Sequence, residues 1–254
     1  MNNHKIRKIL FKFYRVLRNP KSVIVLFQLL KFKKLSDKKR GFKISPLDLY
    51  PITNERTKTT HFDRHYVYHT SWAARVVREI NPDFHTDISS SLFFAGIVSA
   101  FTPIKFYDYR PADLILSDLE THPGDLCNLP FESNSLSSLS CMHTIEHVGI
   151  GRYGDPVGPN DDIKAINELK RVVKKEGSLL IVVPIGKTPR IEYNAHRIYS
   201  YDQIISMVCD EQFELKEFAF IPERDEQGGL IRYAKKEDIK DSYYACGCFW
   251  FIKK

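Results

Sequence analysis

The pattern of hydrophobic and polar positions predicts strands and helices in alternation along most of the chain. Between Leu136 and Met142 apolar residues mix with small serines and no charge occurs, which is typical of a strand buried on both faces of a sheet. From Asp161 to Lys175 apolar residues recur every three or four positions, which predicts a helix capped by Asp161 or Asp162 and ended by Gly177. The apolar run from Ser178 to Pro184 predicts the next buried strand. This order is half of a βαβ layout.

The same periodicities predict further elements on both sides of this region. Residues 224–240 are polar, contain two adjacent glycines, and are expected to form a mobile insertion. The expected helices are 61–80, Leu92 to Phe101, and one from Tyr199 to Cys209 capped by Ser200 or Asp202, and the expected strands are 83–88, Ile104 to Asp108, Phe213 to Phe220 and Tyr243 to Ile252. The chain is therefore assigned to the α/β class.

Polar residues stand where the predicted strands end. Open α/β sheets bind ligands beyond the carboxyl ends of their strands, so Asp125, His143, Glu146 and His147 are candidate site residues. The expected helix at 61–80 carries a dense polar cluster, which either lines a substrate mouth or forms a solvated helix face. Its members are His61, Asp63, Arg64, His65, Tyr66, Tyr68 and His69.

The end of the second predicted strand suggests nucleotide binding. Asp108 ends the second predicted strand and lies 21 positions after Asp87 of the first. A carboxylate at the end of the second strand can accept hydrogen bonds from both hydroxyls of a ribose. Acids at strand ends are common, so this feature gains weight only with the loop at 87–91 and the acid at Asp125.

The positive charge of the chain is confined to its N-terminal segment. Of 254 residues, with a formal net charge of +7, residues 1–43 hold 14 Lys or Arg and one acid, whereas the remainder holds 24 basic and 30 acidic residues. We predict a basic amphipathic helical arm at 1–43, a lead-in and covering helix at 44–80, and an α/β domain at 81–254. Within the arm, the apolar spacing predicts a first helix at 6–17 and a second from Pro20 to Phe32. The arm, through residues 5–34, contacts an anionic membrane surface, its own domain or a second subunit. No RNA- or DNA-binding module accompanies the charge, so nucleic acid is not expected.

Further features bear on location and metal binding. The run Val23 to Leu30 is too short to span a bilayer, and no small-residue cleavage site follows it. Five cysteines in an irregular pattern fit a reducing cytosol, so we expect a cytoplasmic protein, peripheral at the inner face of the membrane if the arm binds there. Cys246 and Cys248 have no partner pair, so no metal is expected.

Several of these motifs resemble class I S-adenosylmethionine-dependent methyltransferases. The resemblance covers about residues 60–254 and implies a Rossmann-like, mostly parallel sheet with an antiparallel edge strand and helices on both faces. Other motifs resemble a bacterial branch that is catalogued as a domain of unknown function and associated with surface-polysaccharide biosynthesis. The superfamily motifs are 87–91, the strand end at Asp108, 124–131, 143–147 and 169–177, and the branch motifs are 146–156, 194–197 and 246–249.

The resemblance implies S-adenosyl-L-methionine as cofactor and a role for individual residues. Asp87 with Ser89 and Ser90 would face the methionine part, Asp108 the ribose, and Asp125 with Leu126 the adenine. Three serines stand where the family has a glycine-rich loop, and serine lacks the freedom of glycine at positive φ.

An acceptor hydroxyl needs a general base, and imidazole titrates near neutrality. His143, His147 and His196 are therefore the candidate bases, and Glu146 would orient an imidazole or cap the following helix. Arg152 and Arg197 either bind an anionic group of the acceptor or brace a loop. The remaining candidates for acceptor binding are His147, Tyr153 and Asp155; for His147 a structural hydrogen bond is the alternative.

Two main functions remain from different classes, and a third, minor one is a different reaction on a nucleotide-linked sugar in the same pocket. The first is an O-methyltransferase that acts on a sugar of a cell-surface polysaccharide or its precursor. The second is a non-catalytic, methyltransferase-like binding or scaffold protein of glycan biosynthesis, which the all-serine loop suggests. The oligomeric state is left open.

Overall fold

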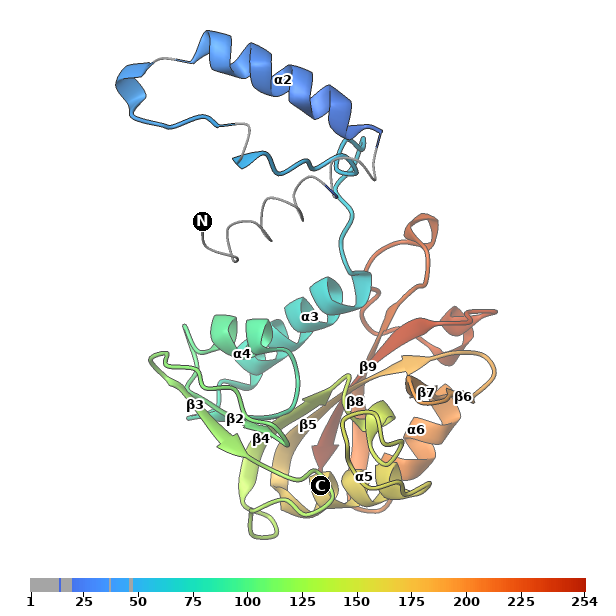
Figure 1. Cartoon of the computed structure of the whole chain (residues 1–254). Coiled ribbons are helices and arrows are strands. Elements are labelled where there is room, and N and C mark those ends of the chain that lie inside the picture. The colour runs from blue at the N-terminus through green and yellow to red at the C-terminus, as the bar shows by residue number, and fades with distance from the viewer. Residues whose placement is uncertain (1–13, 15–19, 37, 46–47) are drawn as a thin grey trace. The chain divides into compact units, whose positions relative to one another are not determined.

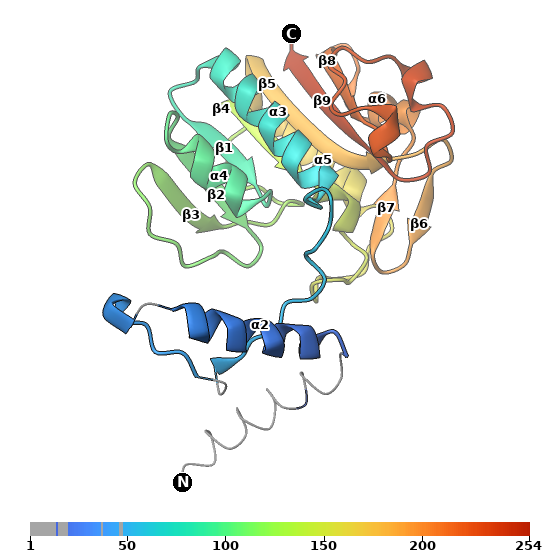
Figure 2. The same ribbon diagram turned by 90° about the horizontal axis from the view of Figure 1, so that it is seen from above.

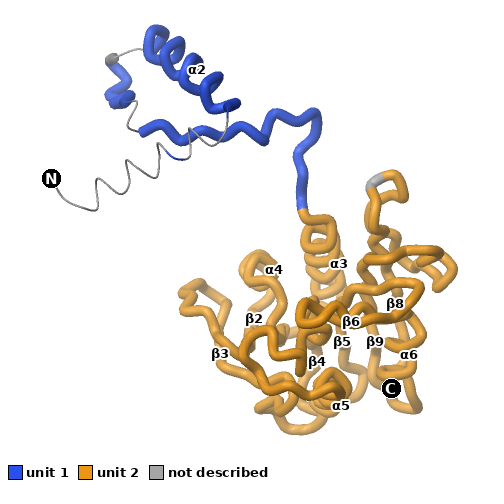
Figure 3. Tube along the Cα trace, turned by 45° about the vertical axis from the view of Figure 1, so that its right-hand side comes forward, with its two compact units in different colours: residues 1–62 blue, residues 63–254 orange. Residues whose placement is uncertain are grey.

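The computed structural model describes residue 14 and residues 20–36, 38–45 and 48–254. The chain divides into two compact units, residues 1–62 and 63–254 (Figure 3). The division falls within the predicted lead-in at 44–80, so that the long helix of this segment belongs to the α/β unit.

Residues 63–254 are built around a seven-stranded sheet in the order β3-β2-β1-β4-β5-β9-β8 (Figure 1). The first five strands in this order run parallel, and β9 is antiparallel to both of its neighbours. The strands are β1 (His85–Ile88), β2 (Ile104–Asp108), β3 (Leu119–Pro123), β4 (Leu136–Met142), β5 (Val173–Ile185), β8 (Phe213–Ile221) and β9 (Ala245–Lys253). The expected α/β fold with an antiparallel pair at one edge is confirmed.

Helices cover both faces of this sheet, as Figure 2 also shows. Helices α3 (Arg64–Ile80) and α4 (Leu92–Val98) pack on one face, and α5 (Asp161–Val172) and α6 (Tyr201–Val208) on the other. Strand β5 shows why both layers form: Leu179 and Ile181 enter the α5–α6 core, whereas Leu180 and Val182 enter the α3–α4 core. A strand buried on both faces needs this near-continuous apolar run.

The end of α5 differs from the prediction. The helix ends at Val172, and Val173 is already extended and pairs with Leu136 of β4. Gly177 is therefore not the residue that ends the helix; it lies in β5 at an irregular pairing, where a Cβ would come within 2.7 Å of the Lys174 carbonyl oxygen. The N-cap position belongs to Asn160, and Asp161 and Asp162 occupy the first turn, where carboxylates still favour the helix dipole.

Two segments of the second half of the chain carry structure that the sequence pattern did not predict. A small hairpin, β6 (Arg190–Glu192) and β7 (His196–Ile198), was not predicted. The insertion at 224–240, expected to be mobile, is tied to β8 by backbone hydrogen bonds in both directions between Phe220 and Ile231. The predicted cap of α6 is confirmed, because Ser200 and Gln203 form a reciprocal capping box.

In residues 1–62 the described helix is α2 (Ser22–Leu35), close to the second predicted helix of the arm. The first predicted arm helix, at residues 6–17, lies outside the described residues apart from Tyr14. No helix in the described part of the chain has the length and apolar character needed to cross a membrane. Short 3-10 turns occur at Lys38–Arg40, Ile145–His147, Asp225–Gln227 and Lys236–Ile239.

Candidate active site

A pocket of 320 Å³ opens at the carboxyl ends of β1, β2 and β4. This volume lies at the lower end of the range of small-molecule sites. Eight predicted site residues line it: Ser89, Asp108, Asp125, Leu126, His143, His147, Tyr153 and Asp155. Six others lie outside its lining: Asp87, Ser90, Glu146, Arg152, His196 and Arg197. The structure thus brings together side chains from the connections after four strands, β1, β2, β3 and β4.

The turn after β1 holds a serine in the conformation that favours glycine. Ser89 has φ 56°, in the left-handed region that costs a side chain about 1 kcal/mol or more. Its amide donates to the Tyr107 carbonyl at 2.7 Å, and its hydroxyl donates to the same oxygen at 3.2 Å. Thr144 donates to the Ser89 carbonyl at 2.9 Å from the other side of the pocket. These bonds stabilise a turn that the sequence alone would assign to glycine.

Asp87 and Ser90 do not line the pocket; their hydrogen bonds to β4 hold this turn in place. Asp87 is fully buried and accepts a short hydrogen bond from Ser140, while His85 contacts Ser140 at 2.9 Å and Ser138 at 2.7 Å. Burial raises the pKa of Asp87 to about 7, although hydrogen bonds from Ser140 and Ser90 oppose this rise. The Ser90 hydroxyl accepts from the Met142 amide at 3.0 Å and ties the turn to β4.

Asp108 and Asp125 present carboxylates at the ends of β2 and β3. Each uses one oxygen to accept a turn amide: Asp108 that of Arg110 at 2.7 Å, and Asp125 that of Cys127 at 2.8 Å. The second oxygen of each carboxylate makes no hydrogen bond within the described residues. Two such oxygens beside a pocket can accept hydrogen bonds from the hydroxyl and amino groups of a nucleoside.

His143 follows β4 directly and is held by two partners. Its Nδ1 lies 2.8 Å from Oε1 of Glu146, which is 1% exposed, and its Nε2 lies 3.5 Å from Sγ of Cys246. Burial alone would lower the pKa of His143, but Cys246 and Glu146 outweigh it and raise the pKa above its ordinary value. Glu146 thus holds the His143 ring through this hydrogen bond.

His147 lines the same pocket, but its pKa is shifted in the opposite direction to that of His143. Its Nδ1 lies 2.8 Å from the Ala195 carbonyl oxygen, which only accepts, so Nδ1 carries the hydrogen and Nε2 the lone pair. Burial lowers the pKa of His147 in spite of the opposing charge of Glu146. A neutral imidazole therefore faces the pocket. Arg152 donates to the same carbonyl at 2.8 Å, which places it as a brace on the β6–β7 hairpin.

The loop at 149–160 forms one wall of the pocket, and two predicted acceptor residues hold it in place. Arg197, 4% exposed, donates to Val148 O at 2.6 Å and to Pro159 O at 3.2 Å, so it ties the two ends of the loop together. Asp155 accepts from the amides of Gly149 at 3.0 Å and Tyr153 at 3.1 Å while it lines the pocket. Arg197 is thus a bracing residue, one of the two roles left open by the sequence.

His196 lies beside the pocket rather than in its lining. Its Nε2 is 3.4 Å from Oε2 of Glu192 across the β6–β7 hairpin, and its ring packs against Tyr244 at a centroid distance of 5.2 Å. The pocket also has lining residues that sequence reasoning missed, among them Arg110, Cys127 and Thr144. Thr144 belongs to the motif at 143–147, and its position between His143 and His147 is the feature of the sequence that could have identified it as a lining residue.

The polar cluster of the first helix turns toward the site. The ring of His65 stacks on that of His143 at 5.4 Å, and the buried ring of His69 lies 4.9 Å from His143. Of the two interpretations of this cluster, the solvated helix face does not apply to these two histidines. Burial lowers the pKa of His65 to about 4 and that of His69 well below its ordinary value, so both rings are neutral near pH 7.

Comparison with known proteins gives one family match. Residues 131–221 match the family described as "Caenorhabditis protein of unknown function, DUF268". This segment runs from the end of the β3–β4 loop to the end of β8 and includes His143, Glu146 and His147. No curated protein matches the sequence.

Solved structures resemble the chain at low identity. A chain of the Haloferax volcanii complex between the Trm112 methyltransferase activator and a methyltransferase is 15% identical, with a TM-score of 0.51, and the match covers 74% of this chain and 89% of that one. The YcgJ protein of Bacillus subtilis is 15% identical, with a TM-score of 0.50 and coverage of 73% and 99%. The N-methyltransferase NodS of Bradyrhizobium japonicum is 9% identical, with a TM-score of 0.50 and coverage of 72% and 85%. The chain therefore has the Rossmann-like fold of class I S-adenosylmethionine-dependent methyltransferases.

Proposed function

We propose that this protein is an S-adenosyl-L-methionine-dependent methyltransferase. The observation that carries the proposal is the pocket at the carboxyl ends of the parallel strands, with Asp108 and Asp125 at the ends of β2 and β3. The NodS structure, which has the same fold, contains S-adenosyl-L-homocysteine, and this supports the cofactor.

The residues of the pocket fit this cofactor in chemical type. Asp108, with one carboxylate oxygen unused, would accept the ribose hydroxyls, and Asp125 with Leu126 would hold the adenine. The turn at Ser89 would lie against the methionine part. When bound, the cofactor supplies an already activated methyl group, so the protein has only to align the acceptor and take up its proton.

Calorimetric titration with S-adenosyl-L-methionine tests the binding step. We expect micromolar binding by the native protein and at least tenfold weaker binding by Asp108→Ala. The matched control is Asp113→Ala, which removes an exposed carboxylate from the same β2–β3 connection outside the pocket lining and should bind as the native protein does. Native-strength binding by Asp108→Ala would contradict the assignment of the pocket.

We infer that, of the candidate bases, His147 takes the acceptor proton and His143 positions the acceptor beside it. His147 is neutral, and its Nε2 lone pair accepts only a long 3.4 Å contact from Arg152, whereas Nδ1 of His143 lies 2.8 Å from Glu146 and its Nε2 lies 3.5 Å from Cys246. General-base catalysis contributes about 10²–10⁴ in rate. His147→Ala should therefore lower kcat at least a hundredfold and leave the Kd of the cofactor within about twofold. Unchanged kcat would remove His147 from the mechanism.

We further propose that the acceptor is a sugar hydroxyl of a cell-surface polysaccharide or its precursor. The support is the sequence resemblance at 146–156 and 194–197, together with two imidazoles suited to a hydroxyl acceptor. Transfer of a labelled methyl group to nucleotide-linked and lipid-linked sugars, with mass spectrometry of the product, tests this. Transfer only to amines would contradict it.

The alternative is a non-catalytic binding or scaffold protein with the same fold. The observation that favours it is Ser89, which holds a strained conformation at the position where a glycine is expected. This alternative predicts no heat on titration with the cofactor, both in the absence and in the presence of candidate sugars. It also predicts that Asp108→Ala complements a deletion strain as well as the native gene does.

We also propose that the N-terminal arm places a cytoplasmic protein on an anionic membrane surface. Helix α2 carries several apolar side chains that are half or more exposed: Val23, Ile24, Phe27, Leu30 and Leu35. Lys31, Lys33 and Lys34 lie in the same helix, and apolar insertion and cationic contacts add at an anionic interface. The full chain should sediment with phosphatidylserine-containing vesicles, and deletion of residues 1–34 should abolish this. Sedimentation of the deletion variant with the vesicles would show that the arm does not bind.

A further inference from the structure

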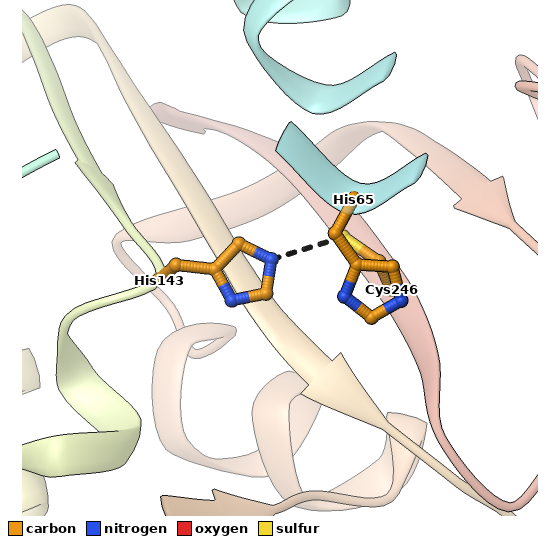
Figure 4. A group of neighbouring side chains, drawn as sticks. All are labelled: His65, His143 and Cys246. Carbon is orange, nitrogen blue, oxygen red and sulfur yellow. Dashed lines mark hydrogen bonds between the residues drawn. The ribbon is translucent and has the colours of Figure 1, made fainter. Parts of the chain in front are cut away.

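Three side chains from distant parts of the chain meet beside the pocket (Figure 4). His65 comes from the first turn of α3, His143 from the end of β4 and Cys246 from β9. One ligand atom of each lies within 4.8 Å of the other two. We propose that these residues bind a divalent transition-metal ion of the zinc class.

The distances suit such an ion. Zinc–sulfur bonds of about 2.3 Å and zinc–nitrogen bonds of about 2.0–2.1 Å imply a separation of roughly 3.5 Å between sulfur and nitrogen in tetrahedral geometry. The distance between Sγ of Cys246 and Nε2 of His143 is 3.5 Å. The ring of His65 makes no hydrogen bond within the described residues, so it is able to rotate inward without losing one.

Glu146 supplies what a metal-bound histidine needs from its surroundings. Histidine ligands usually donate their second ring N–H to a carboxylate, which fixes the ring and the nitrogen that binds the metal. Here Nδ1 of His143 contacts Glu146 at 2.8 Å, which leaves Nε2 for the ion. Oε2 of Glu146 is buried and has no hydrogen-bond partner within the described residues. A bound cation would compensate this buried negative charge.

The ligand set indicates which ion is bound. Two imidazoles and one thiolate favour zinc and similar ions, whereas magnesium and calcium prefer oxygen ligands. Cys246, His143 and Glu146 also have the order of a cysteine nucleophile with its base. However, Cys246 is fully buried and does not line the pocket, so a substrate cannot reach its sulfur.

Three protein ligands leave one position of a tetrahedral ion for water or substrate, as in catalytic zinc sites. His143 is at once a member of this group and part of the pocket lining. An acceptor oxygen in the pocket could take the fourth position, and this step alone rests on the proposed function. Metal binding itself does not depend on methyl transfer.

Metal analysis in the absence of cofactor tests the proposal. After loading with Zn²⁺ and gel filtration, the full chain should hold one zinc per molecule, and the Co²⁺ form should show thiolate-to-cobalt charge-transfer absorption. Cys246→Ser should lose this absorption and bind zinc at least tenfold more weakly. The matched control is Cys209→Ser, which removes a half-buried thiol at the end of α6 and should keep both properties.

A second pair of variants keeps the test decisive if Cys246→Ser fails to fold. His65→Gln changes a partly buried residue near the start of α3 and should also weaken zinc binding at least tenfold, whereas His122→Gln in β3 should not. The circular dichroism of each variant verifies that it is folded. Absence of stoichiometric zinc in the native protein, or native affinity in both Cys246→Ser and His65→Gln, would overturn the proposal. Cofactor titration of the same samples reports separately on the proposed function.

Discussion

The guanidinium of Arg110 lies over the ring of Tyr153, 4.7 Å from its centroid. Arg110 belongs to the connection after β2, where its amide is fixed by Asp108, and Tyr153 belongs to the loop at 149–160. Both residues line the pocket, so two of its walls meet through this contact. The contact joins the part of the pocket near Asp108 to the wall that carries the acceptor candidates.

Arg110→Met tests this contact. Exposed cation–π pairs contribute about 0.5–1 kcal/mol, which corresponds to a two- to fivefold change in an equilibrium constant. We expect the Kd of S-adenosyl-L-methionine to rise by this factor, mainly through faster dissociation. The control Arg75→Met removes an exposed arginine that bonds only to its own helix and should leave the Kd unchanged. An unchanged Kd in Arg110→Met would mean that the contact does not hold the pocket closed.

The conformation of Ser89 predicts opposite effects of two substitutions. Ser89→Gly relieves the cost of φ 56° but loses the hydroxyl bond to Tyr107, so stability should change by less than about 1 kcal/mol. Ser89→Val adds a β-branched side chain at positive φ and should lower the free energy of unfolding by about 1–3 kcal/mol. Urea unfolding measures both variants. The control is Ser91→Gly, at a residue with φ −76°, which measures the effect of introducing a glycine where no positive φ is relieved.

Asp87 should make stability depend on pH. Burial raises its pKa from 3.8 to about 7, so between these values the folded protein holds a proton that the unfolded chain has released. The contribution of this group to the free energy of unfolding is largest below pH 4. It falls as the pH rises to about 7 and is constant above that pH. Asp87→Asn does not titrate, so the stability of the variant relative to the native protein should rise by a few kcal/mol from pH 4 to pH 8.

Urea unfolding of both proteins at several pH values measures this difference, in which the titration of the buried histidines cancels. A difference that stays the same from pH 4 to pH 8 would show that the pKa of Asp87 is not raised.

Arg197 should control both stability and the pocket. It joins Val148 to Pro159 and lies 3.4 Å from a carboxylate oxygen of Asp162, almost entirely buried. Removing one partner of a buried pair costs about 3–5 kcal/mol, so Arg197→Met should destabilise the protein by about this amount. Cofactor binding should weaken as well, because the loop at 149–160 loses its brace. If cofactor affinity stays at the native value in the folded variant, the loop does not need this brace.

The local sequence determined the elements and the edge of the sheet that carries the site. The predicted bounds of β2 and β4 agree with the structure, because the alternation of burial along a strand is a property of neighbouring residues. The polar residues at Asp108, His143 and His147 follow predicted strand ends for the same reason, whereas β3 (Leu119–Pro123), which precedes Asp125, was not predicted. Strand ends are visible in the sequence, and parallel strands bring their carboxyl ends to one edge.

The tertiary structure decided what the local pattern could not. The periodicity of α5 continues past Val172, but pairing of Val173 with Leu136 draws the chain into β5. In the sequence, the serines of β4 indicated only small residues in a buried strand. In the structure, Ser138 and Ser140 are hydrogen-bond partners of His85 and Asp87 in β1. Such contacts depend on which strands become neighbours.

The group of His65, His143 and Cys246 is the clearest case. His143 and Cys246 are 103 positions apart, and the sequence around Cys246 has no metal-binding spacing. Spacing reveals ligands only when they lie on one turn or hairpin. Here the packing of α3 on the sheet and the antiparallel entry of β9 beside β5 bring the three side chains together. That arrangement is determined by burial of the whole sheet, and no segment of the sequence contains it.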